Sequence, residues 1–524
     1  MNPQNPIRLL AGAASCLCLS AATAFAAGSP FTLLNDPVDV SGDFRALENS
    51  YYLADKVSEF DPATHAGKVV YQRAQYHVRH AFDNDLSLIA NVSANEFPDN
   101  QYAANPELPF TIDFVSANTL RIRMTSGPQV HPAQEELMLA GPVPSTPDAW
   151  KYEKIAGGHR YSSAAGSVTI REQPFHLELR DASGRLLTAT DHADDNKSTF
   201  SPVLPFGFVR RAADYSRSYN AAFTLSPGEK IFGCGESFTS FDKRGQKVVL
   251  WTDDANGIEN QGMYKPVPFF LSNRGYGMFM HTTTPITCDF GNTFNGLNSL
   301  MIGDDELDLF VFLGTPKEIL DEYTKLTGKS PLPPLWSFGL WMSRCTYNAE
   351  DQVRDIAAKL RADKIPCDVL HLDTGWFETD WQCDYEFSKT RFTDPKKMLA
   401  DLKNDGFRIC CWQLPYFVPK NKLFPELVSN NLVVRDAKGN LPYEDAVLDF
   451  SNPKTVEWYQ GKLANLLNEG VSAIKVDFGE AAPNDGLWAN GRTGFYEHNL
   501  FPLRYNKAVA DITKQITGDN IIWA

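Results

Sequence analysis

At residues 473–480 the chain reads AIKVDFGE, an apolar run that ends in a charged pair and a glycine turn. The apolar residues predict a buried strand over residues 472–476. Lys475 and Asp477 are two positions apart, so on a strand their side chains lie on the same face. Facing inward, the ammonium of Lys475 would keep the carboxylate of Asp477 ionised and able to act as a nucleophile. A structural ion pair would also explain this tripeptide, so the motif alone does not establish a catalytic site.

Strand and helix signals alternate on both sides of this stretch. Helices are expected from Asn452-Pro453 to Gly470, from Asp394-Pro395 to Gly406, over residues 500–517, and after Asn348 as an N-cap. The expected strands cover residues 338–342, 367–372, 407–412, 472–476 and 521–523. This alternation is typical of a parallel sheet with crossover helices. Four or five strands fit both an open doubly wound sheet and the first part of an eight-stranded barrel.

Polar and aromatic side chains follow three of these expected strands. Asp373 comes directly after the first of the three, with Trp376 just beyond it, while Trp412 and Asp477 end the other two. A (β/α)8 barrel builds its site from the C-terminal ends of several parallel strands. We therefore expect these four residues to share one site. The structural alternative is that Asp373 and Asp477 are helix N-caps or turn residues.

The region before residue 315 has a different pattern. Residues 119–124 and 175–179 alternate between apolar and polar side chains, and turn residues separate the short runs. This pattern predicts an antiparallel β-sandwich over residues 27–314. Thr315-Pro316 and Glu318 then predict a capped helix, followed by the proline-rich sequence SPLPP at residues 330–334. We assign residues 315–335 to a linker and residues 336–524 to the α/β domain.

The N-terminus has the features of a secretory signal peptide. Arg8 is the only charged residue in the first 28, an apolar run covers residues 9–19, and Ala24-Phe25-Ala26 offers a cleavage site. The apolar run is shorter than the roughly 20 residues that a spanning helix needs. We therefore expect residues 1–26 to be removed and the protein to be exported to the periplasm or the medium.

The composition excludes several classes of partner. The 524 residues include 49 basic and 64 acidic side chains, a net charge of -15. Nucleic acids and anionic membranes need a basic surface, so neither is an expected partner. No glycine-rich phosphate loop follows a strand, and the nine cysteines show no metal-ligand spacing. We expect no cofactor and no metal, and we expect the cysteines to be mainly buried hydrophobic residues, with a single disulfide left open.

The string IKVDFGE at residues 474–480 resembles the nucleophile motif of glycoside hydrolase family 31. Further stretches similar to that family occur in the family's order: GCGESF at 233–238, WTDD at 251–254, PFFLSNRGYG at 268–277, WSFGLW at 336–341 and DFSNP at 449–453. Because several separated matches keep this order, the chain is identified as a member of the family.

This resemblance implies a fold and a reaction. The fold would be a galactose mutarotase-like β-sandwich followed by a (β/α)8 TIM barrel. The reaction would be that of an exo-acting, retaining α-glycosidase that releases terminal α-linked glucose or xylose from an oligosaccharide or glycoside. Asp477 would be the nucleophile that forms a covalent glycosyl-enzyme.

The resemblance also implies substrate-binding roles for six other residues. Trp376, Trp412 and Phe478 would wall the subsite of the reacting sugar. Asp373 would hydrogen-bond the ring hydroxyls, and Lys475 would support both substrate and nucleophile. Asp254, on a loop of the sandwich, would reach over the mouth of the barrel.

The family's second catalytic carboxyl group has no match in this sequence. The family supplies its acid/base as an Asp downstream of the nucleophile, and no such motif occurs up to Ala524. A barrel of about 250 residues also needs more chain than residues 336–524 provide. We therefore expect a truncated barrel whose residues alone are inactive.

The sugar specificity rests on two small residues. Xylosidase-like members tend to carry a bulky residue after the position of Asp373, where this chain has Thr374-Gly375. The smaller volume would leave room for a hydroxymethyl group, which favours α-glucoside over α-xyloside. The alternatives are an α-xylosidase, an α-galactosidase-type hydrolase and a non-catalytic carbohydrate-binding protein. The oligomeric state is left open.

Overall fold

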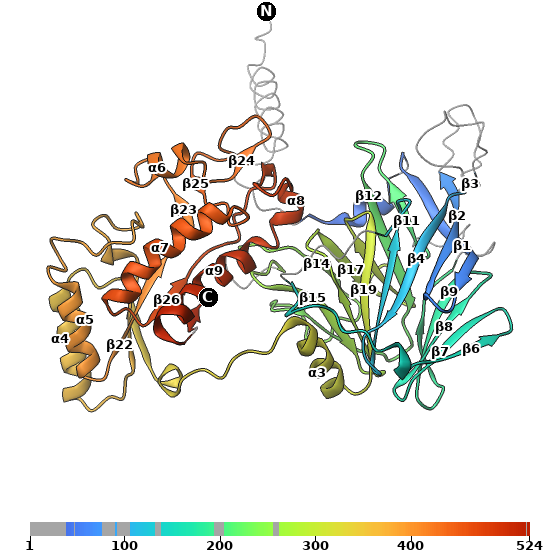
Figure 1. Ribbon diagram of the computed structural model, residues 1–524, viewed down its shortest axis with the longest axis horizontal. Helices are drawn as coiled ribbons and strands as arrows, with labels where there is room; N and C mark the ends of the chain where they lie inside the picture. Colours follow the sequence, from blue (N-terminus) through green and yellow to red (C-terminus); the bar gives the residue numbers. More distant parts are fainter. Residues whose placement is uncertain are drawn as a thin grey trace, which may run out of the picture.

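A computed structural model describes residues 38–46, 48–75, 90–91, 105–130, 138–192, 204–254, 261–519 and 521–524. These residues form a β-rich part before residue 315 and an α/β part after residue 335, which lie side by side in Figure 1. The predicted signal peptide lies outside the described residues and stays a prediction. In the described ranges, no helix is long and apolar enough to cross a membrane.

The β-rich part contains two antiparallel sheets. The larger has the strand order β13-β15-β16-β19-β5-β4-β2-β1-β11-β12-β18-β17-β14, with β3 paired to β2, and the smaller has the order β10-β9-β8-β7-β6. The larger sheet comprises β1 Ser50–Asp61, β2 Ala66–Gln75, β3 Ala90–Asn91, β4 Glu107–Phe114, β5 Thr119–Thr125, β11 Gly207–Arg210, β12 Arg217–Thr224, β13 Ile231–Gly235, β14 Lys247–Leu250, β15 Pro266–Ser272, β16 Tyr276–Met280, β17 Ile286–Phe290, β18 Leu297–Ile302 and β19 Glu306–Leu313. The smaller comprises β6 Lys151–Ile155, β7 Gly158–Ser162, β8 Gly166–Arg171, β9 His176–Asp181 and β10 Leu186–Ala189.

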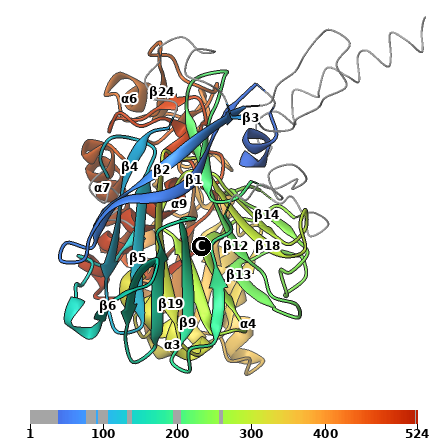
Figure 2. The same cartoon turned by 90° about the vertical axis from the view of Figure 1, so that its right-hand side faces the viewer.

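One apolar core holds these two sheets together. Along β4 every second side chain is buried, which is the period expected when one face of a strand points inward. Ile112 and Ile122 from the larger sheet belong to the same buried cluster as Val168 and Leu177 from the smaller one. The predicted β-sandwich is therefore confirmed, and Figure 2 shows its strands facing the viewer.

A helix and an irregular segment connect the two parts. Helix α3 (Pro316–Thr327) begins with the predicted capping box, in which Thr315 and Glu318 satisfy each other's backbone N–H groups. Ile319 and Leu326 on its inner face are buried against phenylalanines of the larger sheet. The proline-rich sequence then leads into a short 3-10 helix, η5 (Leu335–Phe338).

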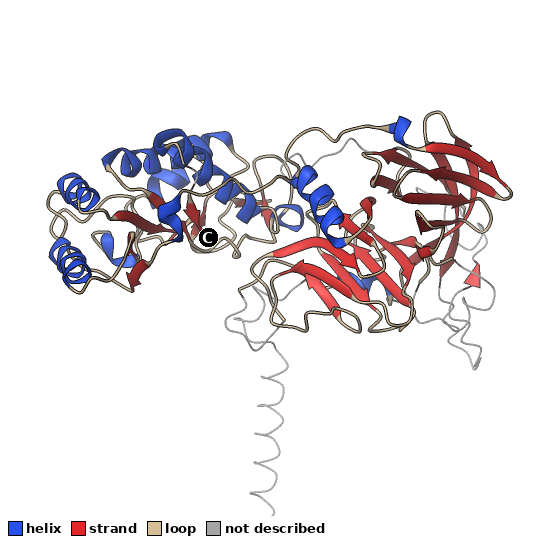
Figure 3. Ribbon diagram, turned by 90° about the horizontal axis from the view of Figure 1, so that it is seen from below, coloured by secondary structure: helices blue, strands red, loops and turns tan. Residues whose placement is uncertain are grey.

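The α/β part contains a parallel sheet of five strands in chain order. These are β20 Trp341–Arg344, β21 Val369–Leu372, β22 Arg408–Gln413, β26 Ala473–Val476 and β28 Ile522–Trp523. The longer helices, which Figure 3 shows in blue outside the sheet, are α4 Glu350–Ala362, α5 Pro395–Asn404, α7 Pro453–Glu469 and α9 Phe501–Thr517. The remaining elements are η1 Val40–Phe44, η4 Pro147–Ala149, η6 Thr374–Trp376, β23 Tyr416–Phe417, α6 Phe424–Ser429, β24 Arg435–Asp436, β25 Ala446–Val447, β27 Gly486–Leu487 and α8 Gly494–Glu497.

The cysteines of the described residues are all free. Six of the seven are buried, as the sequence predicts, and Cys345 is exposed. Their apolar surroundings explain the burial, since a thiol behaves as a small hydrophobic group.

Candidate active site

The register of the parallel sheet brings the predicted polar side chains to one edge. Leu372 of β21 pairs with Cys411 of β22, and Trp412 of β22 pairs with Lys475 of β26. Because all three strands run in the same direction, the residues at and just beyond their C-terminal ends meet there. Asp373, Trp412, Lys475 and Asp477 are therefore neighbours, as expected.

One oxygen of the Asp477 carboxylate is held and the other is open. Oδ2 accepts a hydrogen bond of 2.5 Å from Trp412 Nε1 and lies 3.2 Å from Lys475 Nζ. Within the part of the chain that the structure describes, no hydrogen bond reaches Oδ1, and 36% of the side chain is exposed. A carboxylate in this state is fixed in orientation and keeps one oxygen available for chemistry.

The ammonium of Lys475 lies between two carboxylates. Its Nζ is 3.2 Å from Oδ2 of Asp477 and 3.5 Å from Oδ2 of Asp373. The same nitrogen lies 5.2 Å from the ring centroid of Trp523, close enough for a cation–π contact. A single cation thus joins the ends of β21 and β26 and partly neutralises the local negative charge.

The Asp373 carboxylate is occupied on both oxygens. Oδ1 accepts the backbone N–H of Thr374 at 3.0 Å, and Oδ2 lies 3.0 Å from His371 Nε2. Burial would raise the pKa of this carboxyl, but the hydrogen bonds from His371 and Thr374 and the charge of Lys475 outweigh it, so the pKa is lowered. Asp373 is also the N-cap of η6. Asp373 is therefore both a helix cap, as the structural alternative predicts, and a neighbour of Lys475 at the candidate site.

The two predicted tryptophans lie beneath the site. Trp376 and Trp412 are fully buried, and the indole of Trp376 donates to the carbonyl of Trp412 at 2.9 Å. In this structure neither presents an open ring face: Trp412 binds the Asp477 carboxylate, Trp376 binds the backbone of Trp412, and their contact with substrate stays a prediction. Trp381 is 54% exposed and its ring centroid is 5.5 Å from that of Trp412. Sequence reasoning missed Trp381, which lies in an irregular loop without periodicity.

The backbone turns sharply directly after Asp477. Phe478 has φ 61° and Gly479 has φ 122°, values that favour glycine. The hydroxyl of Tyr416 stabilises this turn by accepting the backbone N–H groups of Gly479 and Ala481, each at 3.0 Å. The turn leaves the Phe478 side chain exposed at the rim, 6.0 Å from the Tyr416 ring. Such strain is found at functional sites, where the surrounding contacts maintain it.

The sandwich contributes an acidic residue next to this edge of the sheet. The hydroxyl of Tyr264 donates a 2.6 Å hydrogen bond to Oδ1 of Asp254. Burial is the main reason that the pKa of Glu480 is raised to about 7; a hydrogen bond from its own backbone N–H lowers the pKa, and the charges of Asp254, Asp477 and Asp253 raise it. The charge of Asp254 thus acts on Glu480, three residues after Asp477, and the contact of Asp254 with substrate stays a prediction. Tyr264 was not predicted, since a lone tyrosine between turn residues carries no sequence signal.

A side chain of the barrel packs against one of the two small residues that follow Asp373. A Cβ added to Gly375 would lie 2.4 Å from Thr346 Cγ2, and the Gly375 N–H donates to Thr346 Oγ1 at 3.1 Å. Thr374 is also buried. The small residues therefore allow close packing against Thr346, and the choice between glucose and xylose stays a matter for the proposal below.

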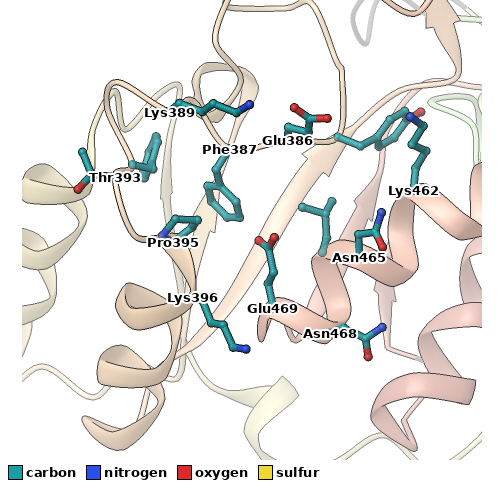
Figure 4. A pocket seen from close by; sticks show the side chains of 13 residues that line it. Glu386, Phe387, Lys389, Thr393, Pro395, Lys396, Lys462, Asn465, Asn468 and Glu469 are labelled. Atoms are coloured by element: carbon teal, nitrogen blue, oxygen red, sulfur yellow. The ribbon is translucent and has the colours of Figure 1, made fainter.

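A separate cavity of about 670 Å³ lies on the outer side of the α/β part. Figure 4 shows it between the loop around Phe387 and helix α7, with Lys396, Lys462 and Glu469 among its lining side chains. None of the predicted site residues lines it. Elsewhere in the described ranges, no three His, Cys, Asp or Glu side chains come together as a metal site requires.

Comparison with protein families gives two matches. Residues 330–523 match the family described as Glycosyl hydrolases family 31 TIM-barrel domain. Residues 109–289 match the Glycosyl hydrolase 31 N-terminal galactose mutarotase-like domain. The parallel strands thus belong to a barrel and not to an open doubly wound sheet, and the sandwich is of the expected type.

Curated relatives share part of this chain. The chain is 36% identical to the α-xylosidase XylQ of Lactiplantibacillus pentosus over 67% of this chain and 48% of that protein. It is 33% identical to an α-xylosidase of Emericella nidulans over 57% and 39% of the two chains. It is 29% identical to α-glucosidase 2 of Bacillus thermoamyloliquefaciens over 61% and 40%. The chain therefore spans about half of these relatives' length or less.

Solved structures share the fold. A family 31 dextranase of Flavobacterium johnsoniae, in complex with glucose, superposes with a TM-score of 0.71 at 23% identity over 88% of this chain and 53% of that one. An α-xylosidase from a soil metagenome, in complex with xylose, gives a TM-score of 0.69 at 19% identity over 80% and 63%.

Proposed function

The chain belongs to glycoside hydrolase family 31, and from this premise we propose that the complete protein is a retaining, exo-acting α-glycoside hydrolase with Asp477 as its nucleophile. The observation that carries the proposal is the state of the Asp477 carboxylate. Its Oδ2 is fixed by Trp412 and Lys475, while Oδ1 is free of protein partners in the described part of the chain. Attack on a sugar needs this combination of fixed orientation and a free oxygen.

The first chemical step forms a bond between Asp477 Oδ1 and the anomeric carbon. The bond from that carbon to the leaving oxygen breaks, and the leaving oxygen takes a proton from a general acid. Lys475 and the indole N–H of Trp412 stabilise Oδ2 throughout. Water then attacks the same carbon, loses its proton to the conjugate base, and releases Asp477, so the product keeps the α configuration.

The resemblance implies a second Asp as the general acid, and this residue has no match among residues 1–524. Asp373 is unsuited to this role because both of its oxygens are engaged and its lowered pKa keeps it ionised. Because no matching Asp is identified in residues 1–524, we propose that these residues alone are inactive. Expressed beside the complete gene product, this shorter chain is expected to bind sugar but not to turn over a nitrophenyl glycoside.

The released sugar is α-linked xylose ahead of α-linked glucose. Two relatives above 30% identity are α-xylosidases, and Gly375 offers no extra room for a hydroxymethyl group. Initial rates on nitrophenyl α-xyloside, α-glucoside and α-galactoside test this assignment with the complete protein. The α-xyloside is expected to react fastest, and the α-anomer is expected to form first by NMR. Fastest cleavage of α-galactoside contradicts the assignment.

A non-catalytic carbohydrate-binding protein is the alternative function. It predicts sugar binding in calorimetry with no turnover of any of the three nitrophenyl glycosides. Turnover that disappears in Asp477→Asn excludes this alternative.

Export is also part of the proposal. It rests on the order of basic start, apolar run and small residues in residues 1–26. The expected result is a secreted or periplasmic protein whose N-terminal sequence begins at Ala27. A cytoplasmic protein that begins at Met1 or Asn2 contradicts it.

A further inference from the structure

Two adjacent residues of the barrel hold the sandwich segment that carries Asp254. His498 and Asn499 lie between helices α8 and α9. Asn499 Oδ1 accepts the backbone N–H of Thr252 at 2.8 Å, and its Nδ2 donates to the carbonyl of Leu250 at 3.3 Å. These bonds fasten residues 250–252, which directly precede Asp253 and Asp254, to the barrel.

The imidazole of His498 adds a second set of contacts. Its Nε2 lies 2.7 Å from the carbonyl oxygen of Thr252, and its Nδ1 lies 2.8 Å from the carbonyl oxygen of Ala482. The ring stacks on Trp251 with centroids 3.9 Å apart and planes 7° apart. Ala482 is five residues after Asp477, so this one side chain joins the Asp254 segment to the loop that follows the nucleophile.

We propose that His498 and Asn499 form an interdomain clamp that positions Asp254 for substrate binding, with His498 protonated on both ring nitrogens. Carbonyl oxygens only accept hydrogen bonds, so a ring that bonds two of them must donate from both nitrogens. A neutral imidazole has one N–H and would turn a lone pair toward one of the two carbonyls. The proposal rests on the proposed function, because it takes Asp254 to contact the sugar.

The surroundings of the ring act in opposite directions on its charge. His498 is only 3% exposed, and this burial lowers its pKa; the hydrogen bonds to the carbonyls of Thr252 and Ala482 raise the pKa but do not offset the burial. The charged residues on the adjoining segments are Lys247, Asp253, Asp254, Asp477, Glu480, Asp485, Arg492, Glu497 and Arg504. Glu497 is already paired with Arg504 at 2.7 Å. The clamp is therefore complete at acidic pH and loses one bond as the pH rises.

The kinetic test uses His498→Gln in the complete protein. A glutamine amide donates to one carbonyl and turns its oxygen toward the other, so the clamp loses a bond and a charge. The KM for the best nitrophenyl glycoside is expected to rise about tenfold at pH 5 and about threefold at pH 8, with kcat changed less than threefold. The difference shrinks because the wild type itself loses a bond at high pH. His176→Gln, on β9, is the matched control.

The outcomes separate the parts of the proposal. An unchanged KM at both values of pH overturns the clamp, and a tenfold rise that does not vary with pH overturns the double protonation. If His498→Gln does not fold, Asn499→Ser carries the kinetic test, because it removes the bonds to Leu250 and Thr252 and keeps the stacked ring. For Asn499→Ser a rise in KM is again expected, and an unchanged KM again overturns the clamp.

A spectroscopic test does not depend on turnover. A cationic imidazole stacked on an indole quenches its fluorescence, so the wild-type signal minus that of Trp251→Phe is expected to rise with pH. His498→Gln should show no such titration. A pH-independent difference in the wild type overturns the double protonation. If this titration is seen but no glycoside is cleaved, the proposed function is contradicted, while the double protonation of His498 is still supported.

Discussion

The ends of strands β21 and β26 carry the same side chain in different states. Asp373, after β21, is 15% exposed and has partners on both oxygens. Asp477, after β26, is 36% exposed and has partners on one oxygen only. The same ammonium, that of Lys475, lies within 3.5 Å of both. The two carboxylates differ in their second oxygen. In Asp477 this oxygen has no hydrogen-bond partner in the described residues, whereas in Asp373 it accepts a hydrogen bond. This difference makes Asp477 the candidate nucleophile and Asp373 the candidate binding group.

The difference arises from the backbone beyond each strand. After β21 the chain enters the 3-10 helix η6, whose first N–H group needs a cap, and Asp373 supplies it. After β26 the chain turns through positive φ at Phe478 and Gly479, so its N–H groups point to Tyr416 and not to Asp477. The local turn therefore decides which of the two carboxylates remains available.

The largest expected effect comes from Asp477→Asn. The amide keeps an acceptor for the indole N–H of Trp412 but cannot attack the sugar. We expect kcat to fall at least about a thousandfold, which corresponds to about 4 kcal/mol of activation free energy. The thermal midpoint is expected to change little. Activity within about tenfold of the wild type contradicts the nucleophile assignment.

Asp373→Asn should act through binding and stability. The substitution removes a charged acceptor from His371 and from the N–H of Thr374, which costs about 1–3 kcal/mol in unfolding free energy. We expect kcat/KM to fall about a hundredfold, mainly through KM. Denaturant titration of Asp373→Asn and Asp477→Asn compares their unfolding free energies. Equal stability of the two variants contradicts the proposed difference between the two carboxylates.

The sign of the pH dependence follows from the lowered pKa of Asp373. A carboxyl whose pKa is lower in the folded state stabilises the protein above its unfolded pKa, near 3.9, and that stabilisation is lost as the pH falls through the folded pKa. Below about pH 4 the wild type should therefore approach Asp373→Asn in stability. A constant difference down to pH 2 contradicts the ion pair.

Glu480→Gln should change stability in the opposite pH range. The pKa of Glu480 is raised to about 7, so the folded state holds a proton that the unfolded state releases near its ordinary value. Its stabilisation is present below pH 4.5 and is lost as the pH rises through 7. Between pH 5 and 8 the unfolding free energy of the variant should therefore rise by roughly 2 kcal/mol relative to that of the wild type, allowing for solvent screening.

Kinetics of the same variant test whether Glu480 is the general acid. If it were, Glu480→Gln would slow glycosides with poor leaving groups far more than nitrophenyl glycosides. We expect equal effects on both, within about tenfold of the wild type, because the resemblance implies an Asp and not this Glu as the general acid. In the stability measurement, pH profiles of unfolding free energy that run parallel for Glu480→Gln and the wild type contradict the raised pKa of Glu480.

The smallest expected effect is that of Trp381→Ala. Its exposed ring lies beside the buried Trp412 and is free to stack on a sugar. We expect KM to rise about fivefold, as the loss of roughly 1 kcal/mol of ring contact implies. Stability should change by less than about 0.5 kcal/mol because the side chain is exposed. Tyr215→Ala, an exposed aromatic of the sandwich, is the control, and an equal KM in both variants contradicts the contact.

Local signals predicted the elements of the fold well. Thr315, Asp394 and Asn452 each cap the helix that they were expected to begin. Asn348 was expected to cap helix α4, and this prediction was wrong. Ala349 holds that position without a side-chain bond, and the N–H of Asn348 instead donates to Gln352 Oε1 at 3.0 Å. A cap depends on φ and ψ at one residue, which the residue type alone does not determine.

The sequence predicted which residues lie together at this edge of the sheet, but it predicted their packing less well. Strand-end positions identified Asp373 and Asp477, because parallel strands bring their ends together whatever the intervening chain does. The burial of Trp376 and the packing of Gly375 against Thr346 depend on segments far apart in the sequence. The small size of Thr374 and Gly375 was interpreted as open space, whereas the side chain of Thr346 fills the space beside Gly375. Local sequence patterns do not predict such long-range contacts.

Covalent trapping tests the central claim most directly. A 5-fluoro glycosyl fluoride of the fastest sugar should react with the complete protein, because the fluorine slows release of the glycosyl-enzyme more than its formation. Peptide mapping by mass spectrometry is expected to find one added glycosyl group, on Asp477. An adduct on Asp373 or Glu480, or turnover with no adduct on Asp477, would contradict the account.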